Sequence, residues 1–278
     1  MVDVRQGLAG LRAEWESCRA CNLGVRREQL KGPYIAGEGV ERGIMFISGE
    51  GPTWEEEESG RAFTGVNYVI LTTLLEKLGF NDYYITHLVP CRSCEPALDK
   101  ATNLPRFRKQ RNGPPLPIFH DQPPLPSQLA SCQSRLFQEI YLVDPVLIVT
   151  LGVTAAEAVL QRHVTLSKET GSVIECQVPG GTMRPVLTDK KQVWVRKVHG
   201  EVTMPTEPNP ITYAVLPTIH PGHARRKAGD LGVGSPIRRF GQDVRLAVKI
   251  YERYLVEALG LSPGSMSSPQ GDPDATEV

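Results

Sequence analysis

Three groups of residues in this sequence combine residue types and spacings that chemistry requires. The first is Cys18 and Cys21, whose C-x2-C spacing places two thiolates on one metal ion or iron–sulfur cluster. The same pair could carry redox chemistry, although a redox C-x-x-C is expected to follow a strand of a βαβ unit. The second group, residues 43–65, joins an apolar run to a glycine-containing loop, four consecutive glutamates and a phenylalanine. The third, residues 220–227, places two histidines before three basic residues.

The elements that must position these groups form an alternation of strands and helices. Apolar runs predict four buried strands, at residues 44–47, 82–89, 146–151 and 211–216. Helices are expected at 5–17, 67–80, 126–143 and 240–259, and a T-x-x-E capping box at 154–157 is expected to open another. Such alternation is typical of a parallel sheet with helices on both faces. The sequence therefore predicts an α/β fold, a three-layer α/β/α sandwich with a central, mainly parallel four-stranded sheet.

Two insertions interrupt this pattern. Residues 95–126 are rich in proline and basic residues and are expected to form a partly flexible surface loop. Residues 163–209 contain short β-branched pieces between turn residues, at 172–178 and 192–198, which predict a β-rich insertion with its own hairpin or small sheet. Residues 22–40 are expected to form a loop. We predict one domain over residues 1–261, followed by a disordered tail at 262–278.

Composition excludes several classes of protein. The chain has 278 residues and a formal net charge of zero, which argues against a generally basic nucleic-acid binder but allows a local basic groove. It contains no run of 18 apolar residues, and its first residues lack the apolar core of a signal peptide. We therefore expect a cytoplasmic protein with no membrane association. Its six cysteines are then expected to be ligands or core thiols rather than disulfides.

Side chains that follow three of the predicted strands are expected to meet. In a parallel sheet, ligands bind at the carboxyl ends of the strands. The stretch from Glu50 to Phe63 follows the first strand, His87 lies near the end of the second, and His220 follows the fourth. Taken singly, the acidic loop could be a solvated joint and His87 a structural histidine. Their convergence on one edge is stronger evidence for a site than any one of these motifs.

The ordered motifs resemble those of the iron–sulfur uracil-DNA glycosylases, families 4 and 5 of the uracil-DNA glycosylase superfamily. The resemblance covers most of residues 10–160 and 211–259. Its motifs are C-x2-C followed by L-G-x-R (18–26), GEGP (49–52), GRAF-T-G (60–65), YIT-x-x-V-x-CR (84–92) and HP (220–221).

The resemblance implies a structural [4Fe–4S] cluster with four cysteine ligands. The implied ligands are Cys18, Cys21, Cys91 and Cys132. A tetrahedral zinc ion would accept the same thiolates, so the choice of iron depends on the resemblance. Cys94 is a rival for the fourth position, and Cys176 has no place in the family pattern.

The resemblance also implies a role for each site residue in releasing a base that has been flipped out of DNA. Glu56 would be linked to the attacking water and would stabilise positive charge on the sugar. His220 would donate a hydrogen bond to the departing base. Glu50 and Gly51 would contact the base through the main chain, and Phe63 would stack on it. The implied DNA contacts are His223, Arg225, Arg226 and Lys227.

A second basic cluster lies in the first insertion. Arg106 and Arg108 flank Phe107, a pattern that suits a phosphate backbone and suits a solvated loop equally well.

The chain departs from the family pattern at the site itself. Family members usually carry an asparagine where this chain has His87, and that asparagine reads uracil with one donor and one acceptor. Thr53 replaces the last glycine of the GEGPG motif, and Gly222 replaces a serine. The motifs favour a monofunctional DNA glycosylase of base excision repair, and these departures extend the expected substrate from uracil to a related deaminated or modified base. We expect a monomer acting on single- or double-stranded DNA. The alternative is a non-catalytic iron–sulfur DNA-binding or scaffold protein on the same fold.

Overall fold

The computed structural model describes residues 7–109, 113, 115–178, 211–227, 229, 232 and 234–259. The predicted strand at 192–198 and the predicted disordered tail at 262–278 lie outside the described residues. No helix in the described part of the chain is long and apolar enough to cross a membrane.

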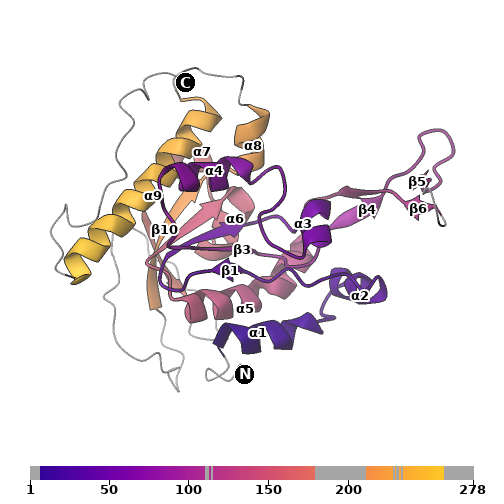
Figure 1. Ribbon diagram of the computed structural model, residues 1–278, viewed down its shortest axis with the longest axis horizontal. Helices are drawn as coiled ribbons and strands as arrows, with labels where there is room; N and C mark the ends of the chain where they lie inside the picture. Colours follow the sequence, from indigo (N-terminus) through magenta and orange to yellow (C-terminus); the bar gives the residue numbers. More distant parts are fainter. Residues whose placement is uncertain are drawn as a thin grey trace.

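A six-stranded sheet with the order β1-β3-β2-β8-β10-β9 forms the centre of the protein (Figure 1). Its four inner strands are parallel, and these are the four strands that the sequence predicts: β2 (Ile44–Ser48), β3 (Tyr83–His87), β8 (Leu147–Leu151) and β10 (Ile211–Thr218). Two antiparallel edge strands extend it, β1 (Glu38–Gly39) beside β3 and β9 (Ile174–Val178) beside β10. The predicted piece at 172–178 therefore joins the main sheet rather than a separate small one.

Helices cover both faces of the sheet, as the three-layer prediction requires (Figure 1). Alternate residues of β2 point to opposite layers, as strand geometry dictates. Ile44 and Phe46 pack with α4 (Val69–Lys77) and α9 (Pro236–Leu259), and Met45 and Ile47 pack with α5 (Pro126–Val143) and α6 (Val153–Leu160). All four of these β2 side chains are fully buried. The strand is apolar throughout because it has no solvent-facing side.

Two helices lie where the sequence predicts loops. The expected loop at residues 22–40 contains α2 (Asn22–Gln29), a short helix that follows α1 (Gly7–Glu16) after a turn at the C-x2-C pair. Because α2 is mostly polar, its sequence lacks the hydrophobic periodicity from which a helix is predicted. The acidic loop contains α3 (Trp54–Ser59), which ends at Gly60 in a left-handed conformation with φ of 70°.

The predicted capping box at residues 154–157 is wrong. The N-cap of helix α6 is Gly152, two residues before the predicted Thr154, and it makes no side-chain cap hydrogen bond. The Glu157 carboxylate instead accepts a hydrogen bond from the Val164 N–H (3.1 Å), beyond the C-terminal end of the helix. The short helix α7 (Leu166–Glu169) follows.

The insertion at residues 95–126 forms an arm rather than the expected irregular loop. It projects away from the body of the protein (Figure 1). Two short antiparallel ladders build it, β4 (Cys94–Pro96) with β7 (Phe119–Asp121) and β5 (Phe107–Arg108) with β6 (Leu116–Pro117). Arg92 anchors its base, because the guanidinium group donates to Glu57 of α3 (2.9 Å) and to Asp121 (2.6 Å). The short ladders lack the alternating apolar pattern by which strands are recognised in a sequence.

Candidate active site

The parallel register brings the predicted site residues to one edge of the sheet. Ser48, the last residue of β2, lies opposite His87 on one side and Leu151 on the other, and Leu151 lies opposite Thr218. The strands therefore end level with one another. Glu50 and His220 each follow their strands by two residues, so the expected convergence is confirmed.

His220 is held as a neutral imidazole with one free donor. It precedes α8 (Pro221–Arg226), and its Nδ1 accepts a hydrogen bond from the Gly222 N–H (3.1 Å). A nitrogen that accepts carries no proton, so the proton of the ring lies on Nε2. The Nε2 atom is buried and has no hydrogen-bond partner among the described residues. Burial lowers the pKa of His220, against the nearby Glu50 carboxylate, which raises it. The site therefore contains a preformed, unused N–H donor.

The space beside His220 is closely filled. A Cβ added at Gly222 would lie 3.1 Å from the Asn67 side chain and 3.1 Å from His220 Nδ1. The glycine that replaces the usual serine therefore leaves no vacancy, because Asn67 occupies that place.

His87 is fully buried, and both of its ring nitrogens face acceptors. The Nδ1 atom lies 3.1 Å from the Glu50 carbonyl oxygen, and Nε2 lies 2.8 Å from Glu56 Oε1. A carbonyl and an ionised carboxylate can only accept, so both nitrogens must donate. The geometry therefore assigns His87 as an imidazolium paired with Glu56 inside the protein.

Glu56 is equally buried, and protein donors surround its carboxylate. Besides His87, the Phe63 N–H donates to Oε1 (2.5 Å) and the Thr53 N–H donates to Oε2 (2.8 Å). Burial raises the pKa of Glu56, but His87 and these two N–H groups outweigh burial and hold the pKa below its ordinary value. Glu56 thus ties the ends of α3, the Phe63 loop and β3 together. Its role toward an attacking water stays a prediction, as does base reading by His87.

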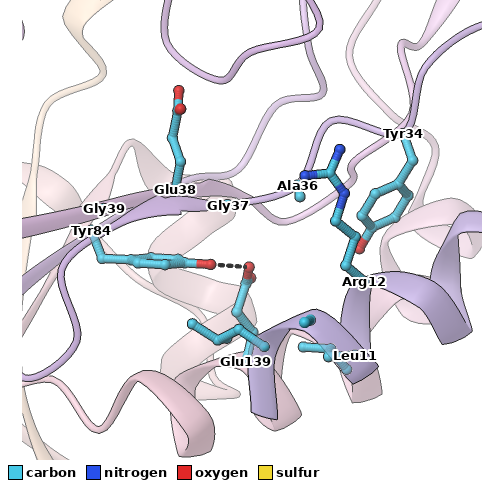
Figure 2. Close-up of a pocket in the computed structure, with 11 residues that line it drawn as sticks. Leu11, Arg12, Tyr34, Ala36, Gly37, Glu38, Gly39, Tyr84 and Glu139 are labelled. Atoms are coloured by element: carbon cyan, nitrogen blue, oxygen red, sulfur yellow. Dashed lines mark hydrogen bonds between the residues drawn. The ribbon is translucent and has the colours of Figure 1, made fainter. Parts of the chain in front are cut away.

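A buried network behind His87 connects it to helix α5. The Arg135 guanidinium donates to the His87 carbonyl oxygen (2.5 Å) and to Glu139 (2.8 Å). Glu139 also accepts from Tyr84 (3.0 Å) and Thr86 (2.8 Å). Figure 2 shows the Tyr84–Glu139 bond beside a cavity of about 270 Å³ between α1 and β1, away from the candidate site. Helix α5 therefore fixes the strand end that presents His87.

Phe63 has a strained backbone and a stacked neighbour. Its φ of 57° lies in the left-handed region that non-glycine residues rarely adopt. Its ring stacks on Tyr68, with ring centroids 4.1 Å apart and an interplanar angle of 7°. The Tyr68 hydroxyl lies 2.8 Å from Ser48 Oγ, and the Tyr68 ring meets both His87 and His220 edge-on. Tyr68 is a site residue that the sequence motifs do not indicate, because its only signal is an aromatic residue at the start of the helix after the GRAF motif.

Four cysteine thiols gather on one side of the molecule. Cys18 and Cys21 lie in the turn between α1 and α2, Cys91 follows β3, and Cys132 is carried by α5. Burial raises the pKa of Cys132 to about 12, and the other three thiols lie near enough to add to that rise. A Cβ at Gly24 would lie 2.4 Å from the Cys18 carbonyl oxygen, so only glycine lets α2 pack on this turn.

Two buried cations accompany these thiols. Arg27 opposes the rise in the pKa of Cys91 that burial causes, and Arg135 opposes the rise at Cys132. Within the described residues, no three histidine, cysteine or acidic side chains are arranged to hold a single metal ion. Thiols grouped beside cations nevertheless fit an iron–sulfur cluster, in which each thiolate binds a different iron.

The remaining two cysteines have partners of their own. Cys94 accepts a hydrogen bond from Arg26, at the base of the arm. Cys176 lies on β9, and its thiol donates to the Val159 carbonyl oxygen (3.1 Å).

The predicted DNA contacts are exposed. They stand on or just after α8, directly beyond His220: His223, Arg225, Arg226 and Lys227. Arg106 is exposed on the arm, whereas the side chain of Arg108 lies outside the described part of the chain.

The fold and the site define an α/β protein with two histidines and a buried glutamate at the carboxyl edge of its parallel sheet, followed by a short basic helix. The chain belongs to the uracil DNA glycosylase superfamily, whose family model matches residues 37–238. A type-4 uracil-DNA glycosylase of Thermotoga maritima is 30% identical over 218 residues, which cover 76% of this chain and 79% of the relative. Relatives with the same name in Archaeoglobus fulgidus and Pyrobaculum aerophilum are each 27% identical, over 58% and 57% of this chain and 69% and 67% of their own. The resemblance inferred from the motifs is confirmed.

Proposed function

We propose that this protein is a monofunctional DNA glycosylase that hydrolyses the N-glycosidic bond of uracil, or of a related deaminated or modified base, and leaves an abasic site. Family membership and the names of the relatives support this function. The observation that carries it in this chain is the buried His220 Nε2–H, which has no hydrogen-bond partner in the described residues and lies 3.6 Å from the Glu50 carboxylate.

The chemistry requires a donor at the departing base. As the glycosidic bond breaks, negative charge accumulates on the base and positive charge on the sugar. A preorganised N–H in a water-poor site stabilises the negative charge without further rearrangement. His220 supplies that donor, and the Gly222 N–H fixes the required tautomer. The base carbonyl oxygen is the atom that Nε2–H would contact.

The buried carboxylate of Glu56 acts through its position rather than through its charge. Glu56 is paired with the His87 imidazolium, so the pair carries no net charge toward the sugar. Its hydrogen bond from the Phe63 N–H holds the strained loop beneath the aromatic pair. Glu50, whose side chain is half-exposed, presents its carboxylate 3.6 Å from His220 Nε2. We propose Glu50 as the acidic group that faces the entrance of the site.

Cys18, Cys21, Cys91 and Cys132 are the proposed ligands of a [4Fe–4S] cluster. When bound, such a cluster would link the N-terminal helices to α5 and to the chain after β3. Arg27 and Arg135 would balance the negative charge of four thiolates, which a buried site requires. Protein purified without oxygen should be brown and contain iron, and a colourless protein that contains zinc would contradict this assignment.

DNA is the proposed partner, bound by one copy of the chain. Helix α8 carries exposed basic residues immediately beyond His220, so phosphates held there would lie next to the flipped base.

Base release from oligonucleotides tests the function. Each oligonucleotide carries one uracil, hypoxanthine, xanthine or 5-substituted uracil, in single- or double-stranded form, and alkali reveals the abasic sites. We expect release of at least one of these bases, and His220→Ala should slow it by about 10²–10³-fold. His163→Ala is the matched control, because the His163 side chain is 87% exposed and its ring pairs with Glu157 of α6, which is not part of the candidate site. Retained DNA binding with no release from any substrate would favour the non-catalytic alternative.

A further inference from the structure

Tyr68 stands where a flipped base has to stack. We propose that Tyr68 is a gate that occupies the base position in the free protein and must move aside before a base enters, so that it helps to set which bases are excised. This inference rests on the proposed function, because the base position is defined by Phe63, His87 and His220.

The surroundings of the Tyr68 ring are those expected for the base. Its plane lies parallel to Phe63, with ring centroids 4.1 Å apart. His87 and His220 meet it edge-on, at centroid distances of 5.7 and 5.8 Å. One aromatic side chain therefore contacts all three of the residues that would define the pocket.

A base cannot share this place with the tyrosine. Phe63 is only 4% exposed and Tyr68 only 1%, so neither face of the Phe63 ring is open to a planar ligand. The Phe63 backbone is fixed, because its N–H donates to the buried Glu56. The hydrogen bond between Glu56 and His87 does not involve Tyr68, so displacement of the Tyr68 ring would expose the Phe63 face and leave that bond in place.

The attachment of Tyr68 suits a gate. The residue ends the turn that joins the Phe63 loop to α4, and its N–H donates to the Gly65 carbonyl oxygen (2.9 Å). A single side-chain hydrogen bond, between its hydroxyl and Ser48 Oγ, fastens the ring. Burial raises the pKa of Tyr68 well above its ordinary value, so the hydroxyl remains protonated at neutral pH. A rotation of this side chain would break its hydrogen bond to Ser48, its stacking contact with Phe63 and its edge-on contacts with His87 and His220.

A closed gate has a measurable consequence for affinity. A ligand that binds only the open form binds more weakly by the fraction of molecules that are open. Removing the ring should remove that penalty for a flipped base but leave the contacts with ordinary DNA unchanged. The relevant quantity is therefore the ratio of two dissociation constants, for an undamaged oligonucleotide and for the same oligonucleotide with one 2′-fluoro-2′-deoxyuridine. The fluorine slows hydrolysis, so binding is measured without turnover.

The test compares three variants at the gate with one elsewhere. Tyr68→Ala removes the ring and should raise this ratio about tenfold or more. Tyr68→Phe and Ser48→Ala keep the ring but remove its hydrogen bond, and each should raise the ratio about fivefold. Tyr251→Ala is the control for a loosened core, because Tyr251 is a buried residue of α9 whose hydroxyl donates to Asp82, away from the site. It should leave the ratio unchanged.

Each outcome separates the gate from the proposed function. A ratio that stays at the wild-type value in all three variants overturns the gate, and if wild type still releases uracil the function survives. If neither the wild type nor any variant releases a base but the ratio rises in the order given, Tyr68 controls the binding of a flipped base and the glycosylase proposal falls. Should Tyr68→Ala fail to fold, Tyr68→Phe and Ser48→Ala decide, since both preserve the packed ring.

Discussion

Replacing Glu56 by glutamine tests whether this carboxylate supports the architecture of the site. The change removes one negative charge and places an amide NH₂ where an acceptor stood. Oε1 receives hydrogen bonds from His87 and from the Phe63 N–H, and Oε2 receives one from the Thr53 N–H. Either orientation of the amide therefore sets its NH₂ against at least one buried donor.

The expected loss of stability is large. A buried donor left without an acceptor costs about 1–3 kcal/mol. Removing one partner of a buried ion pair costs about 3–5 kcal/mol in total, because the His87 imidazolium loses its counter-charge. We expect Glu56→Gln to lower the free energy of unfolding by about 3–5 kcal/mol, a sizeable part of the roughly 5–15 kcal/mol that holds a domain together. With a urea dependence of about 3 kcal/mol per molar, the unfolding midpoint should fall by about 1 M or more.

The loss should depend on pH in a defined direction. The folded-state pKa of Glu56 lies below its ordinary value of 4.5. A carboxyl group with a lowered pKa stabilises the fold above its unfolded value, and this contribution disappears as the pH falls through the folded-state pKa. The difference in the free energy of unfolding between wild type and Glu56→Gln should therefore have its full value at pH 7 and become smaller below pH 4.5.

Urea unfolding followed by circular dichroism at pH 7 measures the effect. Glu58→Gln is the matched control, because Glu58 is exposed on the same short helix. It should change the free energy of unfolding by about 0.5 kcal/mol at most. If Glu56→Gln unfolds at the same urea concentration as the control, Glu56 and His87 are not an ion pair and the assignment of His87 as an imidazolium is wrong.

Three further predictions concern the base donor, the thiols and the basic helix. Burial lowers the pKa of His220 below its ordinary 6.5, so the rate of base release should stay constant as the pH falls through 6.5 and decline only at lower pH. Glu50 raises this pKa, so Glu50→Gln should move the decline to a still lower pH. A decline that moves to higher pH in this variant would contradict the assignment. Cys91→Ser should lose iron and visible absorbance. Cys94→Ser should keep both, because the Cys94 thiol bonds to Arg26 and is not a proposed ligand. Equal iron content in the two variants would contradict the proposed ligand set. Arg226→Gln should weaken binding to all DNA sequences and reduce the salt dependence of log K by about one unit of slope, and an unchanged slope would remove Arg226 from the phosphate contacts.

The strands and most helices could be predicted from the sequence because their signals are local. Each inner strand is a short apolar run that is buried on both faces, as Ile44 to Ile47 illustrate. Helix α5 begins and ends where the pattern places it, at Pro126 and Val143. Helix α2 and the arm escaped prediction because they bury little apolar surface of their own.

The sequence also determined which residues meet at the site, because parallel strands bring their carboxyl ends to one edge. It specified the fold class, the C-x2-C pair, the two histidines and the GRAF motif. Only the tertiary structure decided what those side chains do to one another. That His87 faces two acceptors, that Glu56 has three donors and that Tyr68 stacks on Phe63 depends on contacts between segments from different parts of the chain. Such contacts are fixed by packing in three dimensions, to which residue spacing along the chain gives no direct access.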